Sequence, residues 1–192
     1  MSQSKERQKQ AKVLRIFRKL HRFTGATLFI FFFVISLTGL LLGWKKHTSG
    51  IILPNTAKGT SSDLTTWLPL DSLHSLACQH LHQNVSPDLS LQLDRIDIRK
   101  DKGIVKFVFE DHFWGIQLDG VTGQLLQIER RWSDFIEKMH DGSILDFYFN
   151  TPGEVVKLVY TSVMGLALLL FTITGFWLWY GPKVMRRNAS NK

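Results

Sequence analysis

The stretch Phe23–Trp44 reads FTGATLFIFFFVISLTGLLLGW and contains no charged residue. A hydrocarbon layer of about 30 Å needs roughly 20 consecutive apolar residues in a helix. In water, a helix that is apolar on every side would have no face to present to the solvent. The stretch therefore predicts a transmembrane helix. The segments before and after it must then lie on opposite sides of the membrane.

A second charge-free stretch, Leu158–Tyr180, reads LVYTSVMGLALLLFTITGFWLWY and is also long enough to span. It is preceded by Thr151-Pro152-Gly153-Glu154. Thr at the cap, Pro at the first helical position and Glu three residues after the Thr form a capping box, which predicts a helix start at this point. Small residues in both stretches predict close helix packing, at Gly39 and Gly43 in the first and at Thr161 and Gly165 in the second.

The net charge of +8 is concentrated at the two ends of the chain. Residues 1–22 and 183–192 together hold 12 of the 24 Lys and Arg and one acid, whereas residues 23–182 hold 12 basic and 15 acidic residues. Basic ends on a two-span protein follow the positive-inside rule. We therefore expect both termini in the cytoplasm, a central periplasmic domain and a location in the bacterial inner membrane. The lipid bilayer is then the partner of the basic ends, and a nucleic-acid partner is not expected.

The region between the spans predicts a small α+β domain. Residues 45–69 are rich in Gly, Ser, Thr and Pro and predict a linker. Residues 70–83 have the apolar spacing of an amphipathic helix, and residues 132–139 have it again before Gly142. Between them, strand patterns cover Leu91–Ile98, Ile104–Glu110, Phe113–Leu118 and Leu125–Arg130. A helix followed by hairpins predicts an antiparallel sheet with the helix on one face.

These patterns divide the chain into six segments. They are a basic cytoplasmic or interfacial segment (1–22), transmembrane helix 1 (23–44), a linker (45–69), an extracytoplasmic domain (70–150), transmembrane helix 2 (151–181) and a basic tail (182–192). The predicted fold class is an α+β membrane protein, with two antiparallel transmembrane helices and a small helix-plus-antiparallel-sheet domain.

Several short motifs, in this order, resemble those of the PepSY-associated transmembrane proteins. They are Arg18-Lys19-Leu20-His21-Arg22, Leu37-Thr38-Gly39-Leu40-Leu41, Ile116-Gln117-Leu118-Asp119 with Thr122-Gly123, Met139-His140-Asp141-Gly142, and Ile173-Thr174-Gly175 with Trp177 and Trp179. The resemblance covers most of residues 15–182 and implies a PepSY module outside the membrane. Larger four-span relatives include ferric and siderophore reductases that carry haem on membrane histidines, and PepSY modules in protease propeptides are taken to inhibit.

His21 and His140 match the family pattern and are the candidate haem ligands. Imidazole is a good axial ligand for haem iron. The two residues fall at opposite ends of the predicted spans, so they cannot bind the same iron. Bis-histidine ligation would need a homodimer or a larger membrane complex. In the alternative interpretation, His21 is an interfacial cation and His140 is a polar residue near a helix C-terminus.

His74, Cys78 and His82 follow one flank of the predicted domain helix at i, i+4 and i+8. Sulfur and imidazole suit copper or zinc, but a fourth ligand is missing, so no metal is assigned. The acids Asp94, Asp97, Glu110, Asp111 and Asp119 are interpreted as a solvated face.

Motifs of known catalytic sites, such as G-x-S-x-G, H-E-x-x-H, the P-loop and the dinucleotide glycine fingerprint, do not occur in the sequence. The working hypothesis is a non-catalytic accessory or interaction subunit, linked to iron or redox metabolism. The alternatives are a haem-binding electron-transfer subunit and a membrane-tethered protease regulator.

Overall fold

The computed structural model describes the backbone of residues 2–190 and the side chains of residues 8–187. The outermost basic residues of the predicted tails, Lys5, Arg7 and Lys192, lie outside the described side chains. The chain divides into two compact units. Met1–Leu37 and His140–Lys192 form the helical unit, and Thr38–Met139 form the sheet unit.

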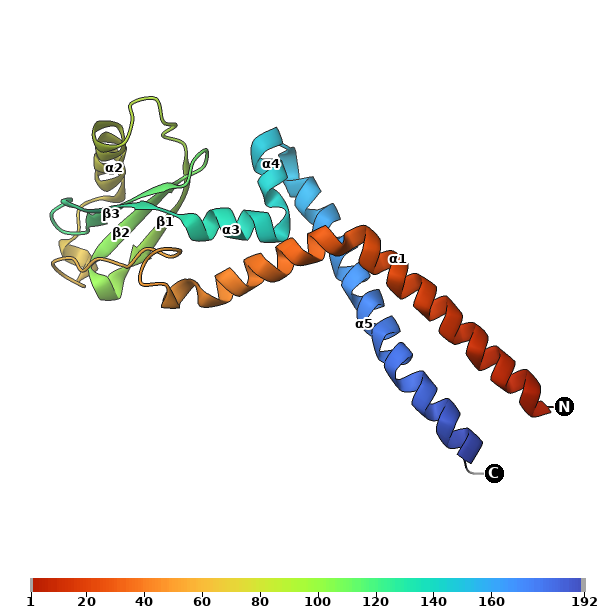
Figure 1. The fold of residues 1–192 in the computed structure, drawn as a ribbon. Coiled ribbons are helices and arrows are strands. Elements are labelled where there is room, and N and C mark those ends of the chain that lie inside the picture. The colour runs from red at the N-terminus through yellow and green to blue at the C-terminus, as the bar shows by residue number, and fades with distance from the viewer. Residues whose placement is uncertain (1, 191–192) are drawn as a thin grey trace. The chain divides into compact units, whose positions relative to one another are not determined.

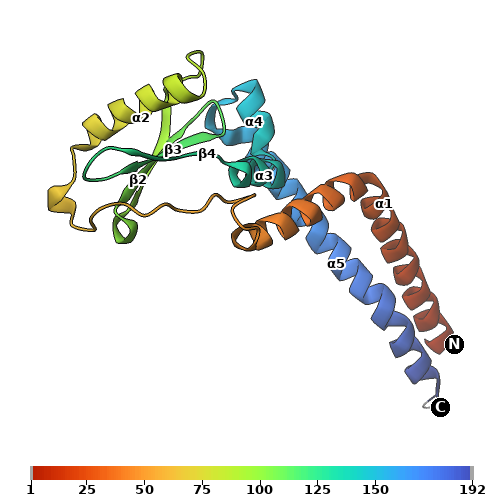
Figure 2. The same cartoon turned by 60° about the vertical axis from the view of Figure 1, so that its left-hand side comes forward.

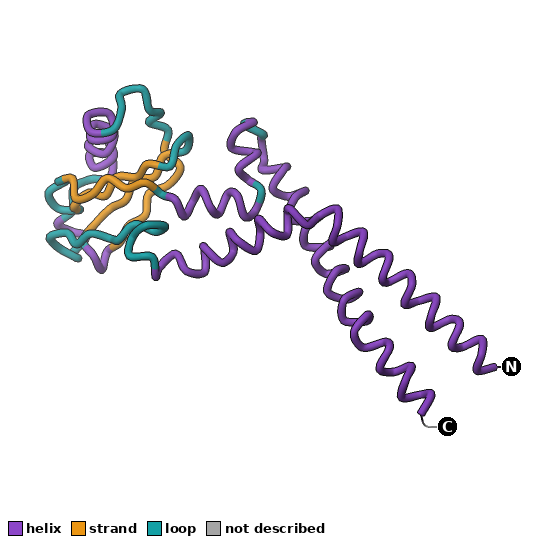
Figure 3. Tube along the Cα trace, in the orientation of Figure 1, coloured by secondary structure: helices purple, strands orange, loops and turns teal. Residues whose placement is uncertain are grey.

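The helical unit is built on two long helices, α1 (Ser2–Trp44) and α5 (Val155–Ser190). The basic segment 1–22 and the first apolar stretch thus belong to one continuous helix. Both α1 and α5 include stretches long and apolar enough to cross a membrane, Gln8–His47 and Pro152–Arg187. The N-terminal part of α1 lies beside the C-terminal part of α5 (Figures 1 and 3), and contacts between the two helices include Leu14 with Gly181 and Phe31 with Tyr160.

Ring contacts show that α1 and α5 are antiparallel. The ring centroids of Phe17 and Trp177 are 6.2 Å apart, and those of Phe31 and Tyr160 are also 6.2 Å apart. Residue numbers therefore rise along α1 as they fall along α5. Little of either apolar stretch is buried by the rest of the chain, which leaves most of this surface for lipid.

The two helices pack closely at Gly25 of α1 and Gly181 of α5. A Cβ atom added to Gly25 would lie 3.0 Å from the Phe171 ring, and one added to Gly181 would lie 2.9 Å from Leu14. An added Cβ at Gly165 would meet no atom within 4 Å among the described residues, so α1 of the same chain does not approach α5 closely at this glycine. Spacing alone identified small residues but not the side of the helix that faces its neighbour.

The connection into α5 passes through two short helices. Helix α3 (Trp132–Asp141) ends at Gly142, whose φ of 81° requires the left-handed conformation that glycine adopts easily. Helix α4 (Ser143–Phe149) follows, and a 3-10 turn (Pro152–Glu154) precedes α5. Sequence patterning did not predict α4 as a separate helix.

The predicted capping box at Thr151 is wrong, because the cap of α5 comes from α4 instead. Thr151 forms no side-chain cap hydrogen bond, and Gly153 has a non-helical φ of 73°. The carboxylate of Asp146 accepts hydrogen bonds from the backbone N–H groups of Val156 (3.1 Å) and Lys157 (2.7 Å). A carboxylate at this position satisfies two of the amides that a helix start leaves unpaired.

We expect Asp146→Ala to destabilise the first turn of α5 by about 1–2 kcal/mol, the usual cost of losing an N-cap. Hydrogen exchange at the amides of Val156 and Lys157, in the full chain in detergent, measures this effect. Asp146→Asn keeps one acceptor oxygen and should exchange at an intermediate rate. Unchanged exchange in Asp146→Ala would show that the cap does not hold this turn.

The sheet unit is a four-stranded antiparallel sheet with strands in sequence order. The strands are β1 (Leu93–Arg99), β2 (Ile104–Phe109), β3 (Trp114–Asp119) and β4 (Leu125–Arg130). Helix α2 (Leu70–Asn84) lies along one face of the sheet (Figure 2). Its residues Leu73, Ala77 and Leu81 are fully buried there. They pack against a strand cluster of Val105, Phe107, Phe109, Ile116 and Leu118.

The segment predicted as a linker is held against the sheet. Short 3-10 helices lie at Lys45–His47 and Leu64–Thr66, and a third, Lys100–Lys102, precedes β2. Between the first two, residues 52–61 run across the face opposite α2 (Figure 2), and we call this segment the strap. The strap's Gly59 N–H donates to the carbonyl of Lys102 (2.7 Å), and the N–H of Ser133 donates to the strap carbonyl of Ile52 (2.9 Å). The sheet is therefore covered on both faces.

Candidate functional site

His21 lies between α1 and α5, where it is positioned by three residues of α5. Its Nδ1 is 3.0 Å from Oγ1 of Thr174, which is fully buried. Its ring stacks on Phe171, with centroids 3.9 Å apart and planes inclined by 24°. A Cβ added to Gly175 would lie 3.2 Å from the His21 ring, so glycine makes room for the imidazole there.

The hydrogen bonds of Thr174 determine which nitrogen of His21 carries the proton. Oγ1 of Thr174 donates its hydrogen to the carbonyl of Leu170 (2.7 Å), one turn back along α5. The oxygen then accepts from Nδ1–H of His21, an assignment made from the hydrogen-bond network, and Nε2 is the ring nitrogen left for another partner. This is the arrangement found in metal-ligating histidines, which donate their second ring N–H to a fixed acceptor.

The other candidate, His140, lies near the opposite end of the helical unit. It follows Met139 in α3, beside Asp141, which pairs with Lys157 of α5 at 3.4 Å. The carboxylate of Asp141 also accepts hydrogen bonds from the backbone N–H (2.9 Å) and the hydroxyl (2.7 Å) of Ser143, at the start of α4. His140 is thus placed by the turn that joins α3 to α4.

The structure does not bring His21 and His140 together. Gly142 lies against Tyr160, whereas His21 contacts Thr174, and these two positions on α5 are fourteen residues apart. Fourteen residues of helix span about 21 Å. A metal–nitrogen bond is only about 2 Å long, so the two imidazoles of one chain cannot bind a common iron.

An apolar groove of about 710 Å³ lies between these two positions, along α1 and α5. Its walls include five aromatic rings, those of Phe29, Phe32, Phe33, Tyr160 and Phe171. His140 and Asp141 line it at the end nearer α4. Phe171 is also the ring on which His21 stacks, so His140 lines the groove directly and His21 lies behind one of its walls.

The residues His74, Cys78 and His82 do not form a three-ligand cluster. Cys78 Sγ lies 3.3 Å from His74 Nε2, whereas His82 Nε2 is 3.0 Å from the carbonyl of Leu89. Among the described residues no group of three or more His, Cys, Asp or Glu side chains is arranged to hold a metal ion. Burial raises the pKa of the Cys78 thiol, which opposes the thiolate form that soft metals bind.

The strap-covered face of the sheet carries a buried ionic network that sequence analysis missed. Glu129 of β4 pairs with Lys106 of β2 at 3.6 Å and with Arg131 at 3.0 Å. Arg131 also pairs with Asp134 at 2.7 Å, and Asp134 accepts a further hydrogen bond from Arg95 of β1 (3.0 Å). Lys106 alternates with the apolar residues Val105 and Phe107 of β2, so its side chain is on the opposite face of the sheet, and nothing local indicated that the strap would cover that face.

Asp119, predicted to be part of a solvated face, is buried, and this prediction is wrong. Its Oδ2 accepts hydrogen bonds from the N–H and the hydroxyl of Thr60 in the strap, both at 2.6 Å. Its Oδ1 accepts from the N–H groups of Val121 (2.8 Å) and Thr122 (2.9 Å) in the β3–β4 turn. One carboxylate therefore joins the strap to the hairpin.

These contacts make the sheet unit sensitive to acid. Burial by itself would raise the pKa of Asp119, but its hydrogen bonds from Thr60, Thr122 and Val121 outweigh burial and lower it. Burial by itself would also raise the pKa of Asp134. Its pairs with Arg131 and Arg95 outweigh burial and lower this pKa. A carboxyl group with a lowered folded-state pKa stabilises the fold above its unfolded value, about 3.9, and loses this contribution as the pH falls through the folded value.

We expect the sheet unit of the wild-type chain to lose stability as the pH falls below about 4, and Asp119→Asn to reduce that dependence. The variant should be less stable than the wild type at pH 6 and should approach it at lower pH. Hydrogen exchange at the amides of Val121 and Thr122, followed between pH 3 and pH 6 after correction for intrinsic rates, measures both effects. Asp71→Asn, which changes an exposed acid of α2, is the control. Parallel profiles for wild type and Asp119→Asn would contradict this role.

These features define a two-span membrane protein with a covered helix-plus-sheet domain and a histidine-bearing helix pair. The family model for the PepSY-associated TM region matches residues 18–192, which is most of the chain. The chain belongs to this family, and the resemblance and fold class predicted from sequence are confirmed. No curated protein and no solved structure matches the chain.

Proposed function

We propose that this protein is a non-catalytic accessory subunit that holds its sheet unit at the outer face of the cytoplasmic membrane for interaction with a partner. The observation that carries this proposal is the way the sheet unit uses its polar residues. Glu129 pairs with both Lys106 and Arg131, and Asp119 accepts hydrogen bonds from Thr60 of the strap. Among the described residues, no buried side-chain nitrogen or oxygen is left without a hydrogen-bond partner. Groups paired in this way stabilise a scaffold and are poorly placed to react with a substrate.

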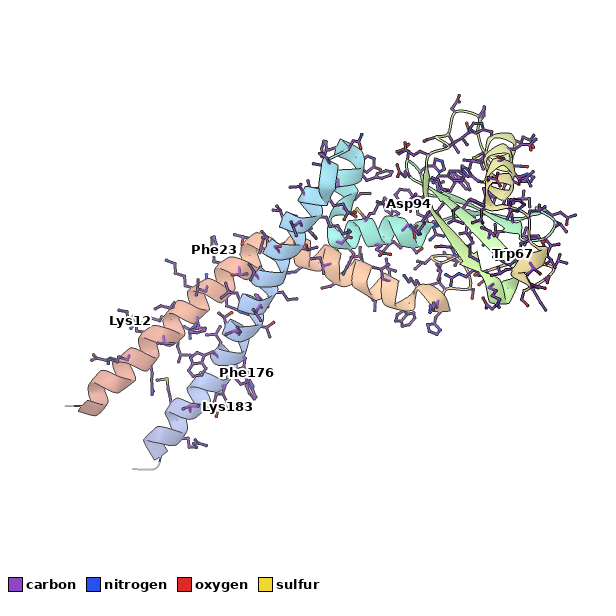
Figure 4. The ribbon with its side chains drawn as sticks, turned by 180° about the vertical axis from the view of Figure 1, so that it is seen from behind. Lys12, Phe23, Trp67, Asp94, Phe176 and Lys183 are labelled. Atoms are coloured by element: carbon purple, nitrogen blue, oxygen red, sulfur yellow. The ribbon has the colours of Figure 1, made fainter. Side chains whose placement is uncertain are left out.

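The orientation of the spans is part of the same proposal. Exposed basic residues occur at the N-terminal end of α1, including Lys12 and Arg15, and at the C-terminal end of α5, including Lys183 and Arg186. Figure 4 shows Lys12 and Lys183 toward the same end of the helix pair, with Phe23 further along α1. A basic end of this kind favours the cytoplasmic, anionic face of the membrane. The sheet unit is then outside.

Photo-crosslinking from the sheet unit in intact cells tests the interaction. Ser75, Asp101 and Glu110 are exposed positions on α2, on the turn before β2 and after β2, and each can be replaced by a photoreactive residue in the full chain. We expect at least one position to give a discrete adduct with a second protein. Leu166, an exposed apolar residue of α5, is the matched control outside the sheet unit. Absence of adducts at all three positions, or adducts only between copies of this chain, would contradict the proposal. A peptidase as the captured partner would favour the protease-regulator alternative.

A second candidate function, a haem-bearing electron-transfer subunit, is favoured by the setting of His21. Its Nδ1 bonds to Thr174 and its ring stacks on Phe171, so Nε2 is the nitrogen that could bind iron. Bound haem would supply one-electron chemistry. Because His21 and His140 of one chain lie too far apart to bind one iron, the second axial ligand would have to come from another copy or a partner.

Ligand variants test this second candidate. If haem is bound through His21, His21→Ala abolishes the haem bands and Thr174→Val, which removes the orienting acceptor, weakens them. His140→Ala reports on the other candidate ligand. His112→Ala is the control, since His112 lies in the sheet unit and bonds to the carbonyl of Ser90. Equal haem content in all four variants would exclude both histidines as ligands.

A further inference from the structure

Helix α4 presents an apolar face to the outside of the helical unit. Leu145, Tyr148 and Phe149 are 44%, 68% and 76% exposed. They stand at i, i+3 and i+4, so their side chains share one face of the helix. Asp146 and Ser143 on the other side are buried. A short helix that buries its polar residues and exposes two aromatic rings is the reverse of what water favours.

The hydrogen bonds of α4 fix its level relative to the predicted span. Asp146 accepts from the backbone amides of Val156 and Lys157, which form the first turn of α5. The charge-free stretch of α5 begins at Leu158 and runs to Tyr180, about 34 Å of helix, which matches a hydrocarbon layer of about 30 Å. The first turn of α5 therefore lies at one surface of that layer, and α4 is bound to it.

The exposed apolar surface continues from α4 into α5. Val155, Leu158 and Val159 on the first turns of α5 are 52%, 67% and 56% exposed. These three residues extend the exposed apolar surface of the span as far as the residues next to α4. In the same region Lys157 pairs with both Asp141 and Glu154, so the charged groups next to this surface are in ion pairs.

We propose that α4 is an interfacial docking element whose face of Leu145, Tyr148 and Phe149 inserts into the lipid at the boundary between head groups and acyl chains. Aromatic side chains are favoured at this depth, where an apolar ring and a polar edge are both accommodated. The Asp146 cap transmits this anchoring to the start of α5. The helical unit is thus held at the membrane surface by α4 as well as by its two spans.

Spin labels in the full chain test the proposal. Tyr148→Cys and Phe149→Cys, each in a Cys78→Ser background because Cys78 is the single native cysteine, carry the label in nanodiscs of phosphatidylethanolamine and phosphatidylglycerol. Asp101→Cys, exposed in the sheet unit, is the aqueous control, and Leu166→Cys, exposed in the middle of α5, is the hydrocarbon control. Collision rates with dissolved oxygen and with a water-soluble nickel chelate report the depth of each label.

We expect both α4 labels to collide with oxygen several-fold more often, and with the nickel chelate several-fold less often, than the Asp101→Cys label. Their depth should lie between those of the two controls. Nickel collisions equal to those at Asp101→Cys would place α4 in water and overturn the proposal. Low collision rates with both reagents would overturn it in a different way, because they would show that protein, not lipid, covers this face. Two label positions keep the test valid if one variant fails to fold.

Discussion

Glu129→Ala is expected to destabilise the sheet unit by about 3–5 kcal/mol, because it leaves two buried cations without their shared partner. The side chain of Glu129 is 1% exposed, and those of Lys106 and Arg131 are 7% and 8% exposed. Glu129 also accepts a hydrogen bond from the buried amide of Gln117. Arg131 retains Asp134 in the variant, whereas among the described residues Lys106 has no second ion pair to replace the one it loses.

The pH dependence of this variant is a second expected signature. Burial lowers the pKa of Lys106, and Glu129 opposes that lowering. Without Glu129 the folded-state pKa of Lys106 falls further below its unfolded value, about 10.4, so the unfolded chain binds more protons and stability rises with pH between the two values. The deficit of Glu129→Ala relative to the wild type should therefore shrink as the pH rises toward 10.

Hydrogen exchange at the β2 and β3 amides of the full chain in detergent measures the deficit. Glu137→Ala removes an exposed acid of α3 and is the matched control, expected to change stability by about 0.5 kcal/mol or less. Glu129→Leu combined with Lys106→Met replaces the pair by apolar groups and should recover much of the loss. A deficit below about 1 kcal/mol in Glu129→Ala would show that water reaches this network.

Gly59→Ala is expected to destabilise the sheet unit by about 3 kcal/mol, at the upper end of the cost of overpacking. An added Cβ would lie 2.2 Å from the carbonyl oxygen of Gly103, a backbone atom that cannot move aside as a flexible side chain can. The strap would have to lift, which weakens the bond from Ala57 N–H to Gln117 (3.0 Å) and the bonds from Thr60 to Asp119.

Exchange at the amides of Ala57 and Thr60 is the measurement that detects this lifting. Gly43→Ala is the control, since an added Cβ there meets nothing within 4 Å and alanine favours helix. Equal protection of the strap amides in Gly59→Ala and the wild type would show that the strap accommodates a methyl group. It would also show that the close approach of Gly59 to Gly103 is not required for the fold.

Periodicity predicted the elements that depend on local pattern. Helix α2, predicted over 70–83, occupies Leu70–Asn84, and strand β4 has the predicted bounds Leu125–Arg130. Within the predicted strand Ile104–Glu110, the alternating apolar residues Val105, Phe107 and Phe109 form the face of β2 that meets α2. Both predicted spans are helical, because uninterrupted apolar residues leave no alternative in lipid.

The features that sequence did not predict depend on partners distant in the chain. The strap has the composition of a linker, and only its bonds to Gln117 and Asp119, about 60 residues later, make it part of the sheet unit. The cap of α5 comes from Asp146 in the preceding helix α4, whereas the sequence pattern next to α5 predicted Thr151 as the cap. Asp119 was interpreted as solvated because a turn acid usually is, and nothing local indicated that Thr60 would cover it.

The candidate site shows the same division between local and distant information. The motif Arg18-Lys19-Leu20-His21-Arg22 identified His21, but its acceptor Thr174 and its stacking partner Phe171 lie about 150 residues away. The sequence did place His21 and His140 at opposite ends of the spans, and the spacing along α5 agrees with that separation. The orienting contacts of His21 required the antiparallel register of α1 and α5.

The reduced-minus-oxidised visible spectrum of the full chain is the most direct test of the accessory role. The protein is purified in detergent from cells supplied with a haem precursor, so that haem is not limiting. If the protein is an accessory subunit, we expect the spectrum to show no haem bands whose intensity corresponds to one haem per chain or per pair of chains. Haem bands in such a ratio, lost in His21→Ala and retained in His112→Ala, would contradict the accessory role and identify an electron-transfer subunit.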